Sequence, residues 1–146
     1  MIGDNKVKFT YDPDNHLTTC YRTVHNKIYT GTAKCHPDDY DFENTLTGEH
    51  YAYTRSMLAE MRVLRDEYRS QLKILKHLYN IYEQNSNINL DSSECYHVRR
   101  QIQLLKRDIE EMTELINVTR DDLHNVIKEK DKLYAKLRTS RASINN

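Results

Sequence analysis

Glycine and proline are absent from residues 49–146, because all three glycines and both prolines lie within the first 48 residues. These two residue types interrupt helices most readily. Tryptophan is absent as well and there are only two phenylalanines, whereas the chain contains 11 tyrosines. The composition therefore changes at Gly48, from a segment that contains turn-forming residues to a long segment suited to continuous helix.

An excess of charge of either sign is also lacking, since Lys+Arg and Asp+Glu number 22 each. A balanced chain has no overall positive field of the kind that attracts nucleic acid or anionic membranes. No apolar run approaches the roughly 18 residues that a membrane-spanning helix needs, and residues 1–6 have no apolar signal core. We therefore expect a soluble, cytoplasmic protein without a membrane partner, and nucleic acid is not an expected ligand.

Metal-binding and catalytic motifs are lacking too. The three cysteines, an odd number far apart in the chain, are expected to be reduced thiols. Cys35-His36 and Cys95-Tyr96-His97 do not have the spacing of zinc ligands. The acidic residues from Asp39 to Glu43 depart from a calcium loop at its glycine and glutamate positions. No nucleophile elbow, phosphate-binding glycine loop or HExxH motif is present. We expect no metal, no cofactor and no enzymatic activity.

Three short segments in the first part have the pattern of strands. Residues 6–11 alternate polar and apolar side chains, which predicts that Val7, Phe9 and Tyr11 share one half-buried face. Residues 17–24 and 28–34 are predicted as the second and third strands, separated by turn signals. A three-stranded antiparallel meander cannot bury both faces alone, so we expect the next element, a helix, to cover it.

Two long helices are predicted in the second part, at about residues 49–84 and 92–139, with Gly48 marking a bend before the first. Asp91 and Glu94 resemble a capping box, with Leu90 as its hydrophobic staple. Each helix has a heptad seam typical of coiled coils. The seam of the first helix is Met57, Met61, Leu64, Tyr68, Gln71, Leu75, Leu78 and Tyr82. The seam of the second is Val98, Ile102, Leu105, Ile109, Met112, Ile116, Thr119, Leu123, Val126, Lys130, Leu133 and Leu137.

These patterns predict an α+β fold that is mostly α: a small three-stranded antiparallel sheet followed by a long, coiled-coil-like antiparallel helical hairpin. We expect residues 1–48 to form the sheet and an acidic connector, and residues 49–146 to form the hairpin. Apolar residues off the seams widen the apolar surface beyond what one partner helix covers. We therefore expect homo-oligomerisation, with an interface at Leu123, Val126, Leu133 and Leu137; the alternative is a monomeric hairpin packed on its own sheet.

A basic column is the most specific surface feature of the first predicted helix. Arg55, Arg62, Arg69 and Lys76 recur at every seventh residue. One interpretation is a solvated flank whose side chains cover the seam and pair with neighbouring carboxylates. The other is an anion site, in which arginines hold the phosphates of a nucleotide or nucleic acid and a tyrosine stacks on a base. The candidate anion-binding residues are Arg55, Arg62, Arg65, Arg69, Arg99, Arg107 and Tyr82.

One stretch of the sequence resembles a known pattern. Residues 29–42 contain Gly-x-Ala-Lys-Cys-x-Pro-x-Asp and an acidic-aromatic segment, and Thr47-Gly48, Ala52 and Arg55 follow. This arrangement is similar to one in small accessory proteins of phages and prophages of Gram-positive bacteria. It covers about a fifth of the chain and brings no catalytic assignment. The resemblance implies a phage-encoded, non-structural protein that acts in the cytoplasm of the host cell.

The expected function follows from the helices together with this resemblance. We expect a non-enzymatic binding protein that oligomerises through its helices and antagonises an anti-phage defence target of the host. Its partners would be a second copy of itself and either a host defence protein or a signalling nucleotide that it sequesters. The alternative is a structural coiled-coil adaptor without a small-molecule ligand.

Overall fold

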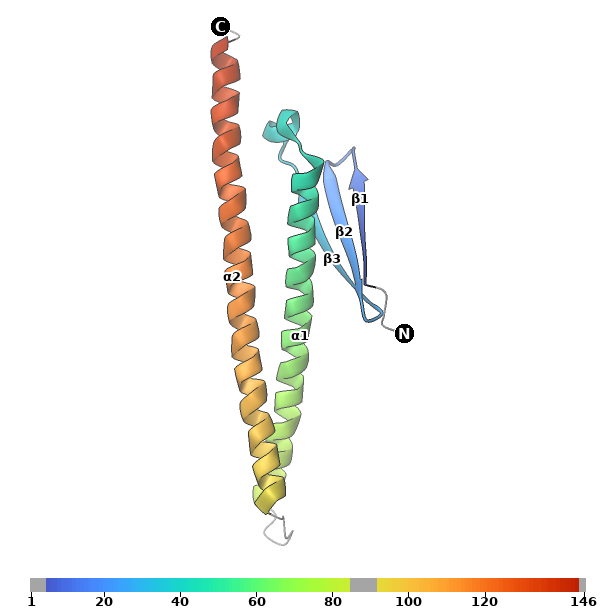
Figure 1. Ribbon diagram of the computed structural model, residues 1–146, viewed down its shortest axis with the longest axis vertical. Coiled ribbons are helices and arrows are strands. Elements are labelled where there is room, and N and C mark those ends of the chain that lie inside the picture. The colour runs from blue at the N-terminus through green and yellow to red at the C-terminus, as the bar shows by residue number, and fades with distance from the viewer. Residues whose placement is uncertain (1–4, 85–91, 145–146) are drawn as a thin grey trace. The chain divides into compact units, whose positions relative to one another are not determined.

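The computed structural model describes residues 5–84 and 92–144. An antiparallel sheet of three strands precedes a short 3-10 helix and two long α-helices, so the predicted α+β, mostly α fold is confirmed (Figure 1). The elements are β1 (Lys6–Asp12), β2 (Leu17–Val24), β3 (Lys27–Lys34), η1 (Pro37–Phe42), α1 (Thr45–Gln84) and α2 (Ser92–Ile144).

The sheet has the order β1-β2-β3, and its strands agree with the predicted ones to within a residue. Val24 pairs with Lys27, so only His25 and Asn26 connect β2 to β3. Both have positive φ, 49° and 64°. Two consecutive residues with positive φ are what a type I′ hairpin turn requires, and its twist matches that of the flanking strands. The meander therefore follows from local turn chemistry.

Small side chains allow α1 to lie close against the sheet. Cys20, Ala33 and Ala52 form the buried cluster, with Phe9 and Tyr51 packed against it. A Cβ atom on Gly31 would overlap the backbone of α1 at Ala52 and Ser56. A glycine is therefore required where β3 meets the helix. The prediction that the next helix covers the sheet is confirmed, but Val7 and Tyr11 are about half exposed and only Phe9 of β1 reaches the core.

A buried arginine joins β2 to α1. Arg22 is 8% exposed, and its Nε donates to Ser56 Oγ at 3.1 Å. Its guanidinium also pairs with Glu60. Because a buried charge needs a partner and hydrogen bonds, these contacts specify the position of α1 along the sheet.

The start of α1 differs from the prediction. Asn44 Oδ1 accepts hydrogen bonds from the backbone N–H groups of Leu46 and Thr47, at 2.9 and 3.4 Å, so Asn44 acts as the N-cap. The expected bend at Gly48 is wrong, because this cap starts the helix upstream and Gly48 lies within its first turn. The acidic connector forms η1, with Pro37 at its start.

The chain divides into two compact units that cut across both helices. Unit 1 comprises Met1–Glu60 and Val118–Asn146, and unit 2 comprises Met61–Asn117. The sheet thus shares its unit with the beginning of α1 and the end of α2, whereas the sequence predicted a boundary at Gly48. Within unit 1, the sheet and the end of α2 lie on different sides of α1 (Figure 1).

The helical seams deviate from strict heptads. In unit 2, Gln71 and Leu78 of the predicted α1 seam are exposed, and their neighbours Leu72 and Tyr79 are half-buried instead. An α-helix drifts by about 20° per heptad relative to a 3.5-residue repeat, so a straight helix leaves a strict heptad seam after a few turns. The expected seam was therefore wrong at these two positions.

The same deviation occurs on α2 in unit 1. Val126 and Leu133 are about half exposed, whereas Ile127 and Tyr134 are the half-buried residues. Leu90 and Asp91, which the predicted capping box and staple require, lie outside the described residues. Over the described residues, neither helix contains a stretch long and apolar enough to cross a membrane.

Candidate functional site

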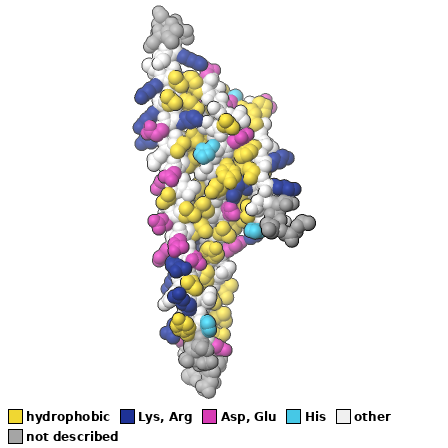
Figure 2. Space-filling view, in the orientation of Figure 1, with side chains coloured by type: hydrophobic (Ala, Val, Ile, Leu, Met, Phe, Trp, Pro, Cys, Tyr) yellow, Lys and Arg dark blue, Asp and Glu magenta, His cyan; other side chains and the backbone are white. Residues whose placement is uncertain are grey.

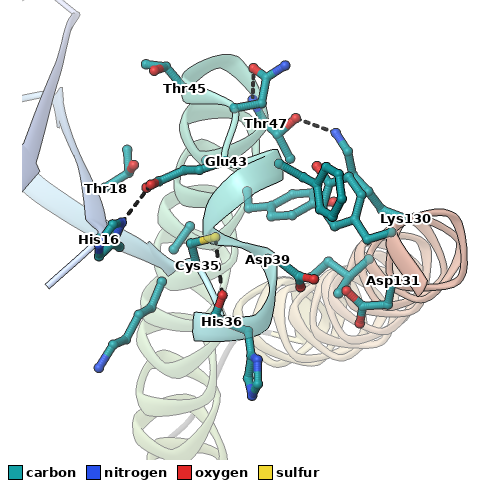
Figure 3. A pocket seen from close by; sticks show the side chains of 18 of the residues that line it. His16, Thr18, Cys35, His36, Asp39, Glu43, Thr45, Thr47, Lys130 and Asp131 are labelled. Carbon is teal, nitrogen blue, oxygen red and sulfur yellow. Dashed lines mark hydrogen bonds and ion pairs between the residues drawn. The ribbon is translucent and has the colours of Figure 1, made fainter. Parts of the chain in front are cut away.

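A cavity of about 230 Å³ lies in unit 1, where the end of the sheet, η1, the first turns of α1 and the end of α2 meet (Figure 3). Its lining combines aromatic rings with ionisable groups from all four elements. Convergent polar groups in a partly apolar hollow are typical of small-molecule sites. Every lining residue belongs to unit 1. The lining includes His16, Cys35, Asp39, Phe42, Glu43, Thr47, Tyr51, Arg55, Lys130, Asp131 and Tyr134.

A histidine–carboxylate pair forms one wall of this cavity. His16 has a positive φ of 49°, and its Nδ1 donates to Glu43 Oε2 at 2.7 Å. Tyr11 donates its hydroxyl to the other oxygen of Glu43, also at 2.7 Å. The His16 ring stacks on Tyr40 of η1, with 3.6 Å between the ring centroids. Glu43 therefore connects β1 and the β1–β2 loop to the connector that precedes α1.

These contacts shift the pKa values of Glu43 and Tyr11. Partial burial acts to raise the pKa of Glu43, but the hydrogen bonds from His16 and Tyr11 outweigh it and the pKa lies below its ordinary value. The hydrogen bond to Glu43, with smaller contributions from burial and charge, raises the pKa of Tyr11 to about 12. Glu43 is accordingly an anion at neutral pH, and Tyr11 is a hydroxyl donor.

Cys35 lies in the same cavity but does not have the surroundings of a nucleophile. Burial raises the pKa of its thiol, and the charges of Glu43 and Asp39 raise it further. The thiol donates to the carbonyl oxygen of His36 at 3.6 Å (Figure 3). A reactive cysteine needs a lowered pKa and a nearby cation. Cys35 therefore remains a protonated thiol at neutral pH.

Two cations on the helices line the cavity next to neutral partners. Lys130 of α2 donates to the hydroxyl of Thr47 on α1 (Figure 3). Arg55 of α1 donates through Nη1 to the backbone carbonyl of Thr32 at 2.7 Å. Among the described residues, neither cation forms an ion pair with a carboxylate. Both therefore carry charge into the cavity without local neutralisation.

The acidic residues of η1 connect the 3-10 helix to α2. Arg138 pairs with Asp39, and Arg141 pairs with Asp41 at 3.5 Å. Phe42 stacks on Tyr134, with 5.3 Å between the centroids. The acidic run therefore packs η1 against α2 through arginine partners. Among the described residues, no group of three or more His, Cys, Asp or Glu could hold a metal ion.

The structure distributes the predicted anion-binding arginines over both units. Arg55 lies in unit 1, and the other five lie in unit 2. There, Arg69 pairs with Asp66 and Arg107 with Glu111, each on its own helix. Arg62 and Arg99 are exposed, whereas Arg65 is half-buried with an unpartnered Nε. Tyr82 is half-buried near the end of α1.

A shallow hollow in unit 2 is lined by Val63, Asp66, Glu67, Ser70 and Gln71, and by none of these arginines. Arg99 lies near Tyr79 instead. A hydrogen bond to Glu83 raises the pKa of Tyr79, and the charge of Arg99 acts in the opposite direction. Of the predicted anion-binding residues, only Arg55 therefore lines either of these two hollows.

The predicted interface residues on α2 have two different environments. Leu123 is buried within the chain, at 8% exposed. Val126, Leu133 and Leu137 are 47%, 52% and 40% exposed, respectively, and their spacing places them on one side of α2. We call these three residues the α2 apolar stripe. Figure 2 shows hydrophobic side chains interspersed with charged ones on the visible face of the molecule.

Sequence reasoning missed most of the cavity. Tyr51, Lys130 and Tyr134 were predicted as helix residues without a role in a site, Thr47 was named only as part of the stretch with the phage resemblance, and His16 was not singled out. Their grouping depends on α2 packing beside η1 and α1, a contact between residues more than 80 positions apart. The available signal was the difference in length between the two predicted helices. Residues 127–138, which contain apolar and basic side chains, lie near the end of the longer one.

Protein-family models, curated proteins and solved structures were compared with this chain, and none of them matches it.

Proposed function

We propose that this protein is a non-enzymatic binding protein that self-associates through α2 and acts by direct, stoichiometric binding to a target. The α2 apolar stripe is the observation that carries the proposal. Its three residues are each at least 40% exposed on one side of a helix whose adjacent side packs within the chain. A second surface that covers the stripe would remove this apolar area from water.

A second copy of the same chain is the occupant that the charges favour. Asp122 lies just before the stripe, and Lys136 lies toward its C-terminal end. An antiparallel pairing about a twofold axis places Val126 opposite Leu133. It also brings Asp122 of one copy near Lys136 of the other. A parallel pairing would place like charges opposite each other.

The target is inferred from the resemblance to small phage accessory proteins, which makes it a component of host anti-phage defence. Direct binding of a defence protein has more support than nucleotide sequestration by the arginine column. In unit 2, Arg69 and Arg107 are engaged with carboxylates of their own helices, and the hollow described there contains no arginine. Exposed apolar helix residues are the kind of surface that protein interfaces bury.

Light scattering coupled to size-exclusion chromatography tests the self-association. We expect a dimer or larger oligomer for the wild-type protein and a monomer for Val126→Glu/Leu133→Glu. The matched control is His124→Glu/Ala135→Glu, which adds the same charge at exposed positions on another face of α2 and should leave the oligomer unchanged. A monomeric wild-type protein, or equal dissociation of both double variants, would overturn the proposal.

Native mass spectrometry of the protein recovered from host lysate tests the target. We expect a complex with a host protein at fixed stoichiometry. A retained nucleotide would favour sequestration. Recovery of the homo-oligomer alone would favour the alternative, a structural coiled-coil adaptor.

A further inference from the structure

The cavity in unit 1 contains two cations that pair with no carboxylate in the part of the chain that the structure describes. Lys130 and Arg55 donate to neutral oxygens, the hydroxyl of Thr47 and the carbonyl of Thr32. Of the carboxylates in the lining, Glu43 is engaged by His16, and Asp39 by Arg138. Asp131 is the third; it is exposed, and among the described residues it forms no ion pair with Lys130 or Arg55. The inner part of the cavity is therefore suited to a negative group.

A buried donor without a partner among the described residues lines the same cavity as these cations. Tyr51 lines the cavity, and its hydroxyl is inaccessible to solvent and has no hydrogen-bond partner in the described chain. Burial raises the pKa of Tyr51, electrostatic interactions with Tyr134 and Asp131 raise it further, and Arg55 opposes the shift. The hydroxyl is thus protonated at neutral pH. A buried polar group left unpaired is costly, so a ligand that accepts this hydrogen bond would be stabilised.

The size and the walls of the cavity limit the ligand. At about 230 Å³ it is larger than a cavity of roughly 150 Å³ that holds benzene, and smaller than most drug-sized pockets. Phe42 and Tyr134 contribute stacked aromatic rings to its lining, and Ile127 adds aliphatic surface. One ring with a short charged substituent matches this combination.

We propose that this cavity binds a small organic anion, a single ring that bears a carboxylate or a phosphate. Lys130 and Arg55 pair with the anionic group, Tyr51 donates its hydroxyl to it, and the ring lies against the aromatic wall. The inference goes beyond the proposed function and needs no second copy of the chain, because all of these residues belong to unit 1.

Isothermal titration calorimetry of the full-length protein with four probes tests the charge requirement. Benzoate and phenyl phosphate carry the two possible anionic groups on the same ring, benzamide is the neutral counterpart, and inorganic phosphate lacks the ring. We expect one of the two aromatic anions to bind at least about tenfold more tightly than benzamide and inorganic phosphate. The tighter of the two identifies the anionic group.

Two variants test the residues. Lys130→Met should weaken binding of the preferred anion by about ten- to hundredfold, because it removes a charge-assisted contact. Tyr51→Phe should weaken it by about two- to tenfold, while the thermal stability of the free protein stays the same or rises, since the lost hydroxyl had no partner. Lys128→Met is the matched control, because Lys128 is exposed on the same helix and does not line the cavity.

Three results would overturn the inference: no heat of binding for either aromatic anion up to about 10 mM, equal affinity for benzamide, or equal losses in Lys130→Met and Lys128→Met. Thermal unfolding of each variant identifies any loss of binding that comes from loss of fold. A monomeric protein that binds the anion would contradict only the self-association, and an oligomer that does not bind it would contradict only this site.

Discussion

Units 1 and 2 are both built on α1 and α2, but their polar groups are satisfied differently. In unit 1 several charged side chains have partners from distant parts of the chain, such as Arg22 with Glu60 and Asp39 with Arg138, in addition to local pairs such as Lys132 with Glu129. In unit 2 the ion pairs Arg69–Asp66 and Arg107–Glu111 join residues three or four positions apart on one helix. Unit 1 also contains the cavity, whereas the hollow described in unit 2 is shallow.

Contacts between distant residues specify the tertiary arrangement, whereas contacts within one helix do not. Pairs between distant residues require one arrangement of sheet and helices, because a shift of either element leaves a buried charge unpaired. Pairs within one helix form wherever that helix forms, and each contributes only a few tenths of a kcal/mol. We therefore expect substitutions in unit 1 to have larger effects on stability than chemically matched substitutions in unit 2.

The largest effect is expected at the contact between β3 and α1. Gly31→Ala places a methyl group against the backbone of Ala52 and Ser56, which cannot move without displacing the helix. We expect the free energy of unfolding to fall by about 3 kcal/mol or more, measured by urea denaturation. Gly48→Ala is the control. Its methyl group meets only the Thr18 side chain, at 2.8 Å, and alanine favours helix, so the change should stay within about 1 kcal/mol. Similar losses would mean that α1 does not lie against β3 at Gly31.

An intermediate effect is expected for the buried arginine. Arg22→Met keeps much of the side-chain volume but leaves Glu60 without its cation and removes one of the two donors to Ser56, with only the Cys20 thiol remaining. The free energy of unfolding should fall by about 2–3 kcal/mol. Arg69→Met in unit 2 removes an exposed ion pair and should cost less than about 0.5 kcal/mol. Equal costs in chemical denaturation would refute the contrast between distant and local pairs.

The smallest effect concerns the seam of unit 2. Leu72 is half-buried and Gln71 is exposed, although the strict heptad places Gln71 in the seam. We expect Leu72→Ala to lower the free energy of unfolding by about 1–2 kcal/mol, and Gln71→Ala to change it by less than about 0.5 kcal/mol. Thermal unfolding of both variants checks this order. A larger effect for Gln71→Ala than for Leu72→Ala would support the strict heptad seam.

Most of the secondary structure could be predicted because its signals are local. The alternation in residues 6–11, the turn residues between strands and the absence of glycine and proline after Gly48 each act within a few positions. The start of α1 was predicted too late in the chain because Gly48 was interpreted as a bend, and Asn44 was not recognised as the capping residue. The seams were predicted only in part, since the periodicity of a straight helix differs from a heptad and the error grows along the helix.

The candidate site was much less predictable. Arg55 was singled out from its heptad spacing, but its contact with the carbonyl of Thr32 depends on the strand that α1 covers. The acidic residues after Pro37 were expected only to form a connector, and the structure gives Asp39 and Glu43 basic partners from α2 and the β1–β2 loop. Composition shows that such charges exist, but their pairing depends on which elements meet.

By itself, the sequence determined the kind and order of the elements, the meander and the two long helices, because turn chemistry and side-chain periodicity act between near neighbours. Only the tertiary structure decided which face of each helix is covered, that α1 leaves no room for a side chain at Gly31, and that Lys130, Tyr51 and Arg55 line one cavity. These groupings join residues tens of positions apart. They arise from the packing of small side chains and the pairing of buried charges, which no local pattern specifies.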